Sequence, residues 1–543
     1  MAFAGKSVPL PIGGGYVYTE NYGFGLDKAN PGDLLVAEDA GFFRGGIGNS
    51  NCGLLLNTIN LYATSDIMGG WDWWPVVGTQ QTVVVMRGGN TAPATGNDLI
   101  MGNTSTWGSL AAWQILATIS PSLASNEYFF VDGGREAAAN NRKLFIFTGE
   151  TTVRVLSGVI TGGTVVNALA TPPADWTGTN QPKFGAIHEG RLWAGGNAND
   201  PNRIYYSTTA SHEDFTSAGS GSMSVYPGEG DKIVSIMSFN GMLLVWKYPT
   251  GLYYIDTTDP TVTNWKIKRI TLDCGSVNAF CQVAVGDSVL FIDATGRFQI
   301  LTSSQAYSRF SIQCLSDINS YRNPGAFSAV GLQRMRGIYY PDQKTAFFTY
   351  SDGTNGMGTR PNKIIMWNFE GQKPRMTFSN DCIARGAISV WRYRFLNSSV
   401  AQSIYFGGIN CQVTAIKNYN SVAAGTFHIV TVPTDLSFAD PAYSGVKKVG
   451  QFLAFEVAYN TNCTVNVYWD NKLESTFQLI APVYNSPTYS PFKTHYTIKH
   501  AIRGSGYKLS LEFLPAASGQ TFLGVQKITL QFKPGADNGP NTT

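Results

Sequence analysis

The stretch EGRLWAGGNANDPNRIYYST, from Glu189 to Thr208, contains the pattern that decides the fold of this chain. It has an apolar strand pattern, then a cluster of Gly, Asn, Asp and Pro, then a second, aromatic strand pattern. Gly, Asn, Asp and Pro are the residues that tight turns require, so the stretch predicts a β-hairpin. The cluster is either a binding loop or only a turn, and repetition along the chain would favour the turn.

Similar hairpin patterns do recur along the chain. NRKLFIFTGETTVRVLSG starts at Asn141, the opening stretch at Glu189, NGMLLVWKYPTGLYYIDT at Asn240 and GDSVLFIDATGRFQIL at Gly286, so the starts are 48, 51 and 46 residues apart. Two weaker copies follow, QKTAFFTY with NKIIMWNF and AQSIYFGG with CQVTAIKN. A period of about 50 residues with four strands per unit predicts the blades of a β-propeller. A large double-sheet sandwich is the alternative.

The pattern changes after residue 420. Four later segments alternate apolar and polar residues, and these are FLAFEVAY, TVNVYWD, YKLSLEF and KITLQF. Strict alternation predicts strands with one buried and one wet side. The expected fold class is therefore all-β, with a β-propeller-like repeat domain followed by a C-terminal antiparallel β-sandwich. The expected boundaries are an extended N-terminal segment at 1–35, the propeller at 36–420, the sandwich at 421–536 and a flexible tail at 537–543.

Composition narrows the class of protein. Charged residues make up 14% of the chain and aromatic residues 13%, a balance that argues against disorder. The formal net charge of +3 is too small for a general nucleic-acid wrapper. The seven cysteines form no CxxC motif, which is typical of free thiols in a reducing compartment. No long apolar run or signal-peptide pattern occurs, so we expect a soluble protein with no membrane-spanning segment.

Motifs of catalysis are missing from the sequence. It contains no GxxxxGK[ST], HExxH or GxSxG motif, and its glycine-rich start does not precede a helix. Carboxylates such as Asp256 and Asp293 stand at turns, where an Asp side chain usually bonds its own backbone. We therefore predict no catalytic residue, no cofactor, no metal site and no enzymatic activity. A glycosidase remains a weaker alternative, because propeller sites are assembled from distant loops.

Two segments are candidates for contact with another subunit or partner. The segment GGWDWWPVVG places three tryptophans within four residues, which would fill a core, anchor an interface or form a platform for sugar stacking. The turn of the opening stretch is longer than the equivalent turns at Tyr248 and Asp293, and enlarged loops often carry contacts. The candidate contact residues are Trp71, Trp73, Trp74, Asn197, Asn199, Asp200 and Asn202.

The longer stretch GRLWAGGNANDPNRIYYSTTASHEDFT resembles a segment of the tail hub, or nozzle, proteins of short-tailed bacteriophages. The N-terminal VPLPIGG also looks like the extended start of such proteins, whereas GGWDWWP has no counterpart in them. The matching positions look like blade-packing residues rather than catalytic ones. They are Arg191, Leu192, Trp193, Gly195, Asn202, Arg203, Tyr205, Tyr206, Ser207, Glu213, Asp214 and Phe215.

The resemblance implies a structural subunit of the phage tail, made in the host cytoplasm and incorporated into the virion. Such subunits form a homo-oligomeric ring, usually a hexamer, below the portal and adaptor proteins. The ring extends and gates the DNA-ejection channel, passes DNA without sequence-specific binding, and docks tail fibre, spike or needle proteins. The alternative is a propeller-based module at the tail tip that binds a host surface or a glycan.

Overall fold

The computed structural model describes most of the chain. The described ranges are residues 6–10, 34–38, 40–43, 46–49, 54–58, 66–76, 79–87, 97–102, 113–119, 127–135, 142–158, 165–227, 231–304, 309–317, 329–351, 361, 363–370, 374–379, 388–393, 403–408, 412–415, 427–458, 461–480, 495–516 and 524–535. The flexible tail expected at 537–543 and much of the segment at 1–35 lie outside these ranges.

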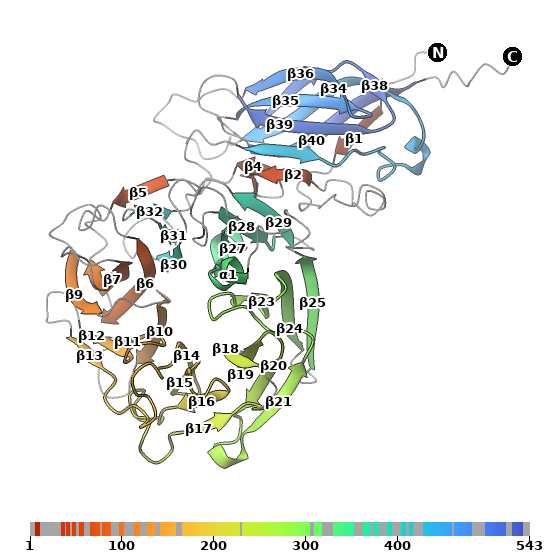
Figure 1. Ribbon diagram of the computed structural model, residues 1–543. Coiled ribbons are helices and arrows are strands. Elements are labelled where there is room, and N and C mark those ends of the chain that lie inside the picture. Colours follow the sequence, from red (N-terminus) through yellow and green to blue (C-terminus); the bar gives the residue numbers. More distant parts are fainter. Residues whose placement is uncertain are drawn as a thin grey trace.

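Within these ranges the chain folds as a seven-bladed β-propeller with further sheets at its rim (Figure 1). Each blade is an antiparallel set of four strands. Blade 1 has β6 (Ile67–Val76), β7 (Thr79–Arg87), β8 (Asn97–Gly102) and β9 (Trp113–Ile119). Blade 2 has β10 (Phe129–Arg135), β11 (Arg142–Phe147), β12 (Arg154–Ser157) and β13 (Val165–Ala168). Blade 3 has β14 (Phe184–His188), β15 (Arg191–Gly195), β16 (Arg203–Tyr206) and β17 (Gly221–Ser224).

The remaining blades follow in chain order. Blade 4 has β18 (Lys232–Phe239), β19 (Met242–Tyr248), β20 (Leu252–Asp256) and β21 (Lys266–Thr271). Blade 5 has β22 (Val283–Val285), β23 (Ser288–Ile292), β24 (Arg297–Ser304) and β25 (Arg309–Asp317). Blade 6 has β26 (Arg336–Tyr340), β27 (Thr345–Tyr350), β28 (Lys363–Asn368) and β29 (Arg375–Ser379). Blade 7 has β30 (Ser389–Tyr393), β31 (Ser403–Gly407), β32 (Gln412–Ala415) and the N-terminal strand β5 (Leu54–Thr58).

The repeats found in the sequence are the middle hairpins of the blades. The copies that start at Asn141, Glu189, Asn240 and Gly286 form the second and third strands of blades 2 to 5, and the two weaker copies do the same in blades 6 and 7. The propeller prediction is therefore confirmed. The sequence did not reveal blade 1, because a longer separation displaces its middle hairpin from the period of about 50 residues.

The ring is closed by strands from both ends of the repeat region. β5 pairs with β32, so the last blade takes its outermost strand from a segment that precedes the first blade. The first strand of each blade lies innermost, and β30 contacts β6 where the last blade meets the first. Helical segments are few among the described residues, namely α1 (Ala329–Gln333) and the 3-10 turns Val262–Asn264, Pro341–Gln343 and Pro441–Tyr443.

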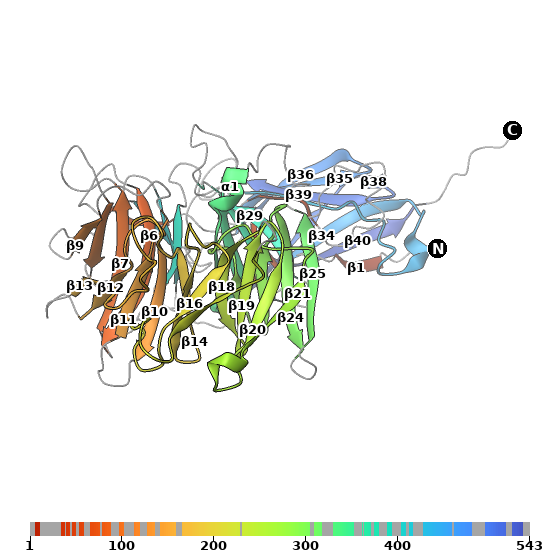
Figure 2. The same cartoon turned by 60° about the horizontal axis from the view of Figure 1, so that its bottom comes forward.

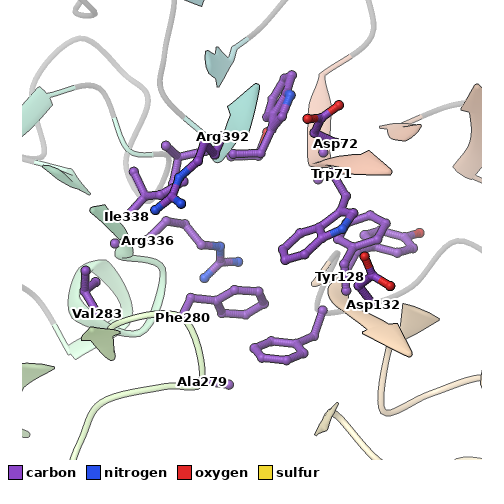
Figure 3. Close-up of a pocket in the computed structure, with 18 of the residues that line it drawn as sticks. Trp71, Asp72, Tyr128, Asp132, Ala279, Phe280, Val283, Arg336, Ile338 and Arg392 are labelled. Carbon is purple, nitrogen blue, oxygen red and sulfur yellow. The ribbon is translucent and has the colours of Figure 1, made fainter. Parts of the chain in front are cut away.

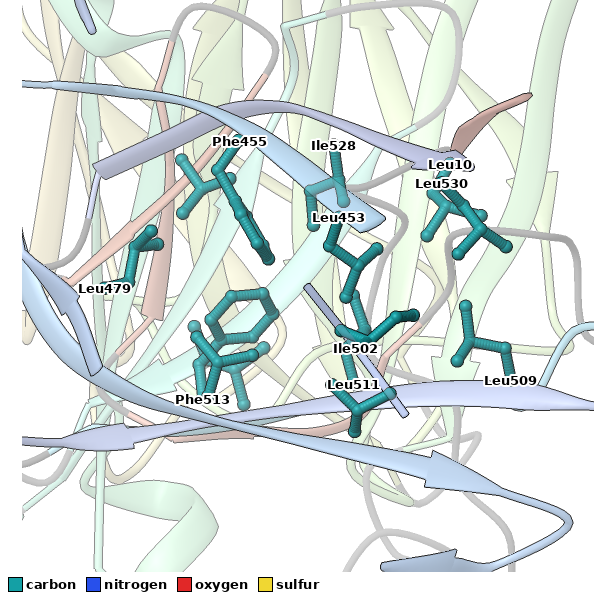
Figure 4. Close-up of a cluster of buried hydrophobic side chains, with 14 of the residues drawn as sticks. Leu10, Leu453, Phe455, Leu479, Ile502, Leu509, Leu511, Phe513, Ile528 and Leu530 are labelled. Atoms are coloured by element: carbon teal, nitrogen blue, oxygen red, sulfur yellow. The ribbon is translucent and has the colours of Figure 1, made fainter. Parts of the chain in front are cut away.

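The C-terminal strands build two sheets that share one hydrophobic core (Figure 4). One sheet contains β1 (Lys6–Leu10), β3 (Ala40–Phe43), β4 (Gly46–Asn49), β34 (Lys448–Ala458), β37 (His495–Ala501), β38 (Ser505–Gly506) and β40 (Gly524–Pro534). The other contains β2 (Leu34–Glu38), β33 (His428–Thr431), β35 (Asn462–Trp469), β36 (Lys472–Ile480) and β39 (Leu509–Pro515). We call these two sheets the C-terminal module.

The sheet that contains β2 runs without a break into blade 6. β2 pairs in parallel with β29 through Glu38 and Phe378, and on its other side it pairs antiparallel with β33, which makes one nine-stranded sheet. Figure 2 shows the C-terminal module beside the rim of the propeller disc. The N-terminal strands up to β4 thus join the C-terminal module, which differs from the propeller start predicted at residue 36. Sequence patterns predict single strands from neighbouring residues, whereas the pairing of β2 with β33 joins segments about 400 residues apart in the sequence.

Candidate functional site

A cavity of ≈ 560 Å³ lies at the centre of the propeller (Figure 3). Its walls come from β6, β10, β18, β22, β26 and β30, which are the innermost strands of six blades, and from the segment that precedes β22. We call it the central cavity. Residues far apart in the sequence meet there because every blade presents its first strand to the axis.

Glycines allow the blades to approach closely around the cavity. A Cβ atom on Gly70 would lie 2.5 Å from ring atoms of Trp391, and a Cβ atom on Gly69 would lie 2.9 Å from the ring of Phe130. Real Cβ contacts are never that short, so only glycine fits at these two positions of β6. The indole of Trp391 therefore packs directly on the backbone of the neighbouring blade.

Aromatic rings form much of the cavity wall. Trp71 stacks on Phe130 with ring centroids 6.3 Å apart and an interplanar angle of 18°. Phe129 of blade 2 meets Phe280, which precedes blade 5, with centroids 5.3 Å apart. Aromatic faces of this kind carry negative charge density and large apolar area, so they suit ligands with C–H groups to present.

Two arginines lie opposite Trp71 and Tyr128 (Figure 3). The guanidinium of Arg336 lies 3.6 Å from the ring centroid of Phe280, and its Nη2 is 3.7 Å from Oε1 of Glu127. Burial lowers the pKa of Arg336, although Glu127 opposes that shift. Arg392 donates from Nη2 to the carbonyl oxygen of Tyr339 at 2.7 Å.

Two carboxylates also line the cavity, and each has a protein partner. Asp132 lies 3.6 Å from Nη1 of Arg142, and Asp72 accepts a hydrogen bond from Nε1 of Trp74 at 3.3 Å. The cavity therefore combines aromatic faces with groups that donate and groups that accept hydrogen bonds. This combination is typical of small-molecule sites, which are largely apolar and have a few well-placed polar groups.

The three tryptophans singled out in the sequence have different positions. Trp73 is fully buried in the core between blades 1 and 2, so its side chain offers no surface for the predicted partner contact. Trp71 and Trp74 are half-buried and line the central cavity. The cavity arginines Arg336 and Arg392 were missed, because nothing in the sequence distinguishes them from arginines on a wet strand face.

Hydrogen bonds and an ion pair within the chain hold the enlarged turn of the opening stretch in place. Asn197 is buried and donates from Nδ2 to the carbonyl oxygen of Asn180 at 3.0 Å, while the backbone N–H of Asn199 donates to Oδ1 of Asn180 at 2.9 Å. Asp200 pairs with Nε of Arg203 at 2.8 Å. Asn202 is buried as well, so the side chains of Asn197 and Asn202 do not face a partner. A contact through Asn199 and Asp200 stays a prediction.

The same turn borders a second cavity of ≈ 300 Å³. Gly196, Asn197 and Ala198 form one side, and Lys183, Lys232 and Tyr248 are among the other lining residues. Phe280 lines both this cavity and the central one. The two cavities therefore adjoin at Phe280.

The turn carboxylates behave as turn residues. Oδ1 of Asp293 accepts from the backbone N–H groups of Thr295 at 2.8 Å and Arg297 at 3.0 Å. Hydrogen bonds from Ser217 and Thr216 lower the pKa of Asp214 to about 2.

Among the described residues no group of three or more His, Cys, Asp or Glu is placed to hold a metal ion. In the same part of the chain, no helix is long and apolar enough to cross a membrane.

No protein-family model and no curated protein matches the chain. Among solved structures it is similar to YCF48 bound to D1 peptide, with 11% identity, a TM-score of 0.36, and coverage of 68% of this chain and 96% of that one. A family 43 arabinoxylan arabinofuranohydrolase from Bacillus subtilis matches with 11% identity, a TM-score of 0.29, and coverage of 89% and 98%. BamB from Moraxella catarrhalis matches with 14% identity, a TM-score of 0.33, and coverage of 64% and 84%.

All three of these proteins are β-propellers, and none is a phage tail protein. The prediction that the chain is not an enzyme is corrected by this comparison, because the structures similar to it include a glycoside hydrolase. The physical reason is that a propeller site gathers residues from many blades. Missing linear motifs therefore do not exclude catalysis in this fold.

Proposed function

We propose that the chain is a structural subunit of a bacteriophage tail, which forms a hexameric nozzle or hub ring and docks other tail proteins. The observation that carries the proposal is the placement of exposed apolar side chains. Eight large hydrophobic side chains are exposed among the described residues, and six of them lie on the C-terminal module or on the segment 432–447 that joins β33 to β34. These six are Phe438, Val449, Phe452, Leu473, Ile480 and Tyr507.

Exposed apolar groups concentrated on one module suit a protein–protein contact. The nine-stranded sheet supports the same role, because β2 joins that module to blade 6 by backbone hydrogen bonds. A partner bound to the module would therefore be linked to the propeller through the pairing of Glu38 with Phe378. The resemblance of the Gly190 stretch to tail hub proteins supports the choice of a phage tail as the assembly.

The propeller axis is an unsuitable path for DNA. Phe129 and Phe280 come from opposite sides of the ring and approach within 5.3 Å between ring centroids. In the proposed assembly the DNA channel is therefore the hole in the middle of the ring of subunits. The portal, adaptor and fibre proteins would dock above and below that ring.

Mass photometry of the purified chain tests the proposal. We expect a species of six times the subunit mass of 58.8 kDa. Phe452→Lys, which places a charge on an exposed position of β34, should reduce that species, whereas the matched variant Tyr226→Lys on the propeller should not. The proposal is contradicted if the chain stays monomeric throughout the micromolar concentration range. It is also contradicted if Phe452→Lys leaves the ring intact while Tyr226→Lys disrupts it.

A further inference from the structure

We propose that the central cavity binds a neutral saccharide of one or two pyranose rings. This inference goes beyond the proposed role in tail assembly and depends only on the propeller. It rests on the aromatic wall around Trp71, the guanidinium and carboxylate groups that line the cavity, and the balance of charge among them.

The size and the wall of the cavity fit a sugar. A volume of ≈ 560 Å³ falls in the range of about 300–1,000 Å³ that small-molecule sites occupy. Trp71 is stacked on Phe130 at an interplanar angle of 18°, so Phe130 supports one face of the indole. One face of a pyranose ring carries C–H groups, and their partial positive charge is attracted to the negative face of an aromatic ring.

The hydrogen-bonding groups of the wall are guanidinium and carboxylate groups. Arg336 and Arg392 lie on the side of the cavity opposite Trp71, and Asp72 and Asp132 line it as well. A guanidinium can only donate and a carboxylate can only accept, whereas a hydroxyl group does both. A ligand with several hydroxyl groups can therefore bond to both kinds of side chain.

The charges of the cavity favour a neutral ligand over an anion. Arg336 has Glu127 beside it, and Asp132 has Arg142 beside it, so each charge is largely compensated. A phosphate or a second carboxylate would also approach Asp72 and Asp132, which repel it. Sugar hydroxyls both donate and accept, so they can pair with the carboxylates on one side and with Arg392 on the other.

Saturation-transfer NMR and intrinsic tryptophan fluorescence test the proposal on the full chain. The probes are maltose, cellobiose, lactose and chitobiose, with glucuronate and thymidine monophosphate as charged comparisons. We expect at least one neutral disaccharide to bind with a dissociation constant of about 1 mM or lower, and more tightly than either anion. The fluorescence of Trp71 should change with the same midpoint.

Variants connect that binding to the cavity. Trp71→Ala should weaken it about tenfold or more, because the stacking surface is lost. Trp71→Phe keeps an aromatic face without the N–H group and should weaken it less, which guards against a folding defect in the first variant. Tyr507→Ala, on the C-terminal module, is the matched control and should bind like the parent.

The proposal is overturned if no neutral disaccharide binds, if thymidine monophosphate or glucuronate binds more tightly, or if Trp71→Ala and Trp71→Phe leave binding unchanged. Loss of the hexamer in the assembly experiment would leave this result untouched, because the sugar measurement uses the propeller of a single chain. Failure of the two proposals is therefore distinguishable.

Discussion

Strands in the blades and strands in the C-terminal module are buried in different ways. Every residue of β15 and β27 is buried, whereas β35 alternates between buried and half-buried positions along its whole length. A blade has a neighbouring blade on each face, so both faces of its middle strands are covered. A sheet of the C-terminal module has a partner sheet on one face only, which leaves the other face open to solvent or to another protein.

The largest expected loss of stability comes from removing a large side chain that is buried between two blades. Trp193 is fully buried among residues of blades 3 and 4, and its Nε1 donates to the carbonyl oxygen of His188 at 3.2 Å. Trp193→Ala should destabilise the propeller by about 3–5 kcal/mol. Ile480→Ala, at an exposed position of β36, should change stability by less than about 0.5 kcal/mol. Urea denaturation monitored by circular dichroism measures both, and equal effects would show that strands of the blades and of the C-terminal module do not differ in burial.

A smaller effect is expected from crowding two blades together. Gly70→Ala would bring a Cβ atom to within 2.5 Å of the buried ring of Trp391, and overpacking of this kind costs about 1–3 kcal/mol. Gly445→Ala, between β33 and β34, meets no atom within 4 Å, so its cost comes from a φ of 68° alone. Thermal melting should show a larger loss for Gly70→Ala. The reverse order would mean that blades 1 and 7 are less tightly packed than the geometry implies.

Acid should weaken the contact between blades 3 and 4 through His188. Its ring nitrogens lie 2.9 Å from Oγ of Ser238 and 2.7 Å from Oγ1 of Thr257, and burial lowers its pKa below the ordinary value of 6.5 despite the opposing effect of Glu189. Below that value the unfolded chain takes up a proton that the folded chain resists. The contribution of His188 to the free energy of unfolding is therefore fully present above about pH 6.5. It falls as the pH drops toward the lowered pKa, by up to about 1.4 kcal/mol per pH unit.

The variant His188→Gln removes this titration while keeping a polar side chain. Its unfolding free energy, measured in urea at several pH values, should fall less steeply below pH 6.5 than that of the parent chain. Identical slopes would show that His188 is not held neutral by the blade contact.

A modest effect is expected from a half-buried carboxylate network in the C-terminal module. Glu512 accepts hydrogen bonds from His428 at 2.8 Å, Asn466 at 2.8 Å and Tyr468 at 2.6 Å. Burial raises the pKa of Glu512, but these bonds outweigh it and the pKa lies below 4.5. Glu512→Gln should cost about 1 kcal/mol at neutral pH. The difference in unfolding free energy between the parent chain and Glu512→Gln should shrink as the pH falls through the lowered pKa. A difference that grows in acid would contradict a stabilising role of the ionised Glu512.

Much of the propeller could be predicted from the sequence, because each blade repeats a local pattern. The hairpin at Glu189 and its five relatives were placed correctly, and the turn residue Asp293 bonds its own backbone as expected. Pairings between distant segments could not be predicted in the same way. The residues around Leu54 do not indicate that β5 completes blade 7. The residues around Leu34 do not indicate that β2 joins blade 6 to the C-terminal module.

The candidate site was only partly visible in the sequence. The cluster of tryptophans drew attention to β6, yet Trp73 fills the core while Trp71 and Trp74 line the central cavity. Arg336 and Arg392 come from strands of blades 6 and 7, and they face Trp71 only once the ring has closed. The opening stretch is a blade hairpin, and its enlarged turn is held mainly by Asn180.

Localisation in the virion tests the account most directly. Phage particles that contain this chain should be imaged by cryo-electron microscopy, with immunogold labelling of the C-terminal module as a second readout. We expect a six-fold ring of seven-bladed propellers in the tail, with the C-terminal modules at contacts between subunits or with neighbouring tail proteins. Absence of the chain from the tail, or a single copy at its tip with the C-terminal module free of contacts, would contradict it.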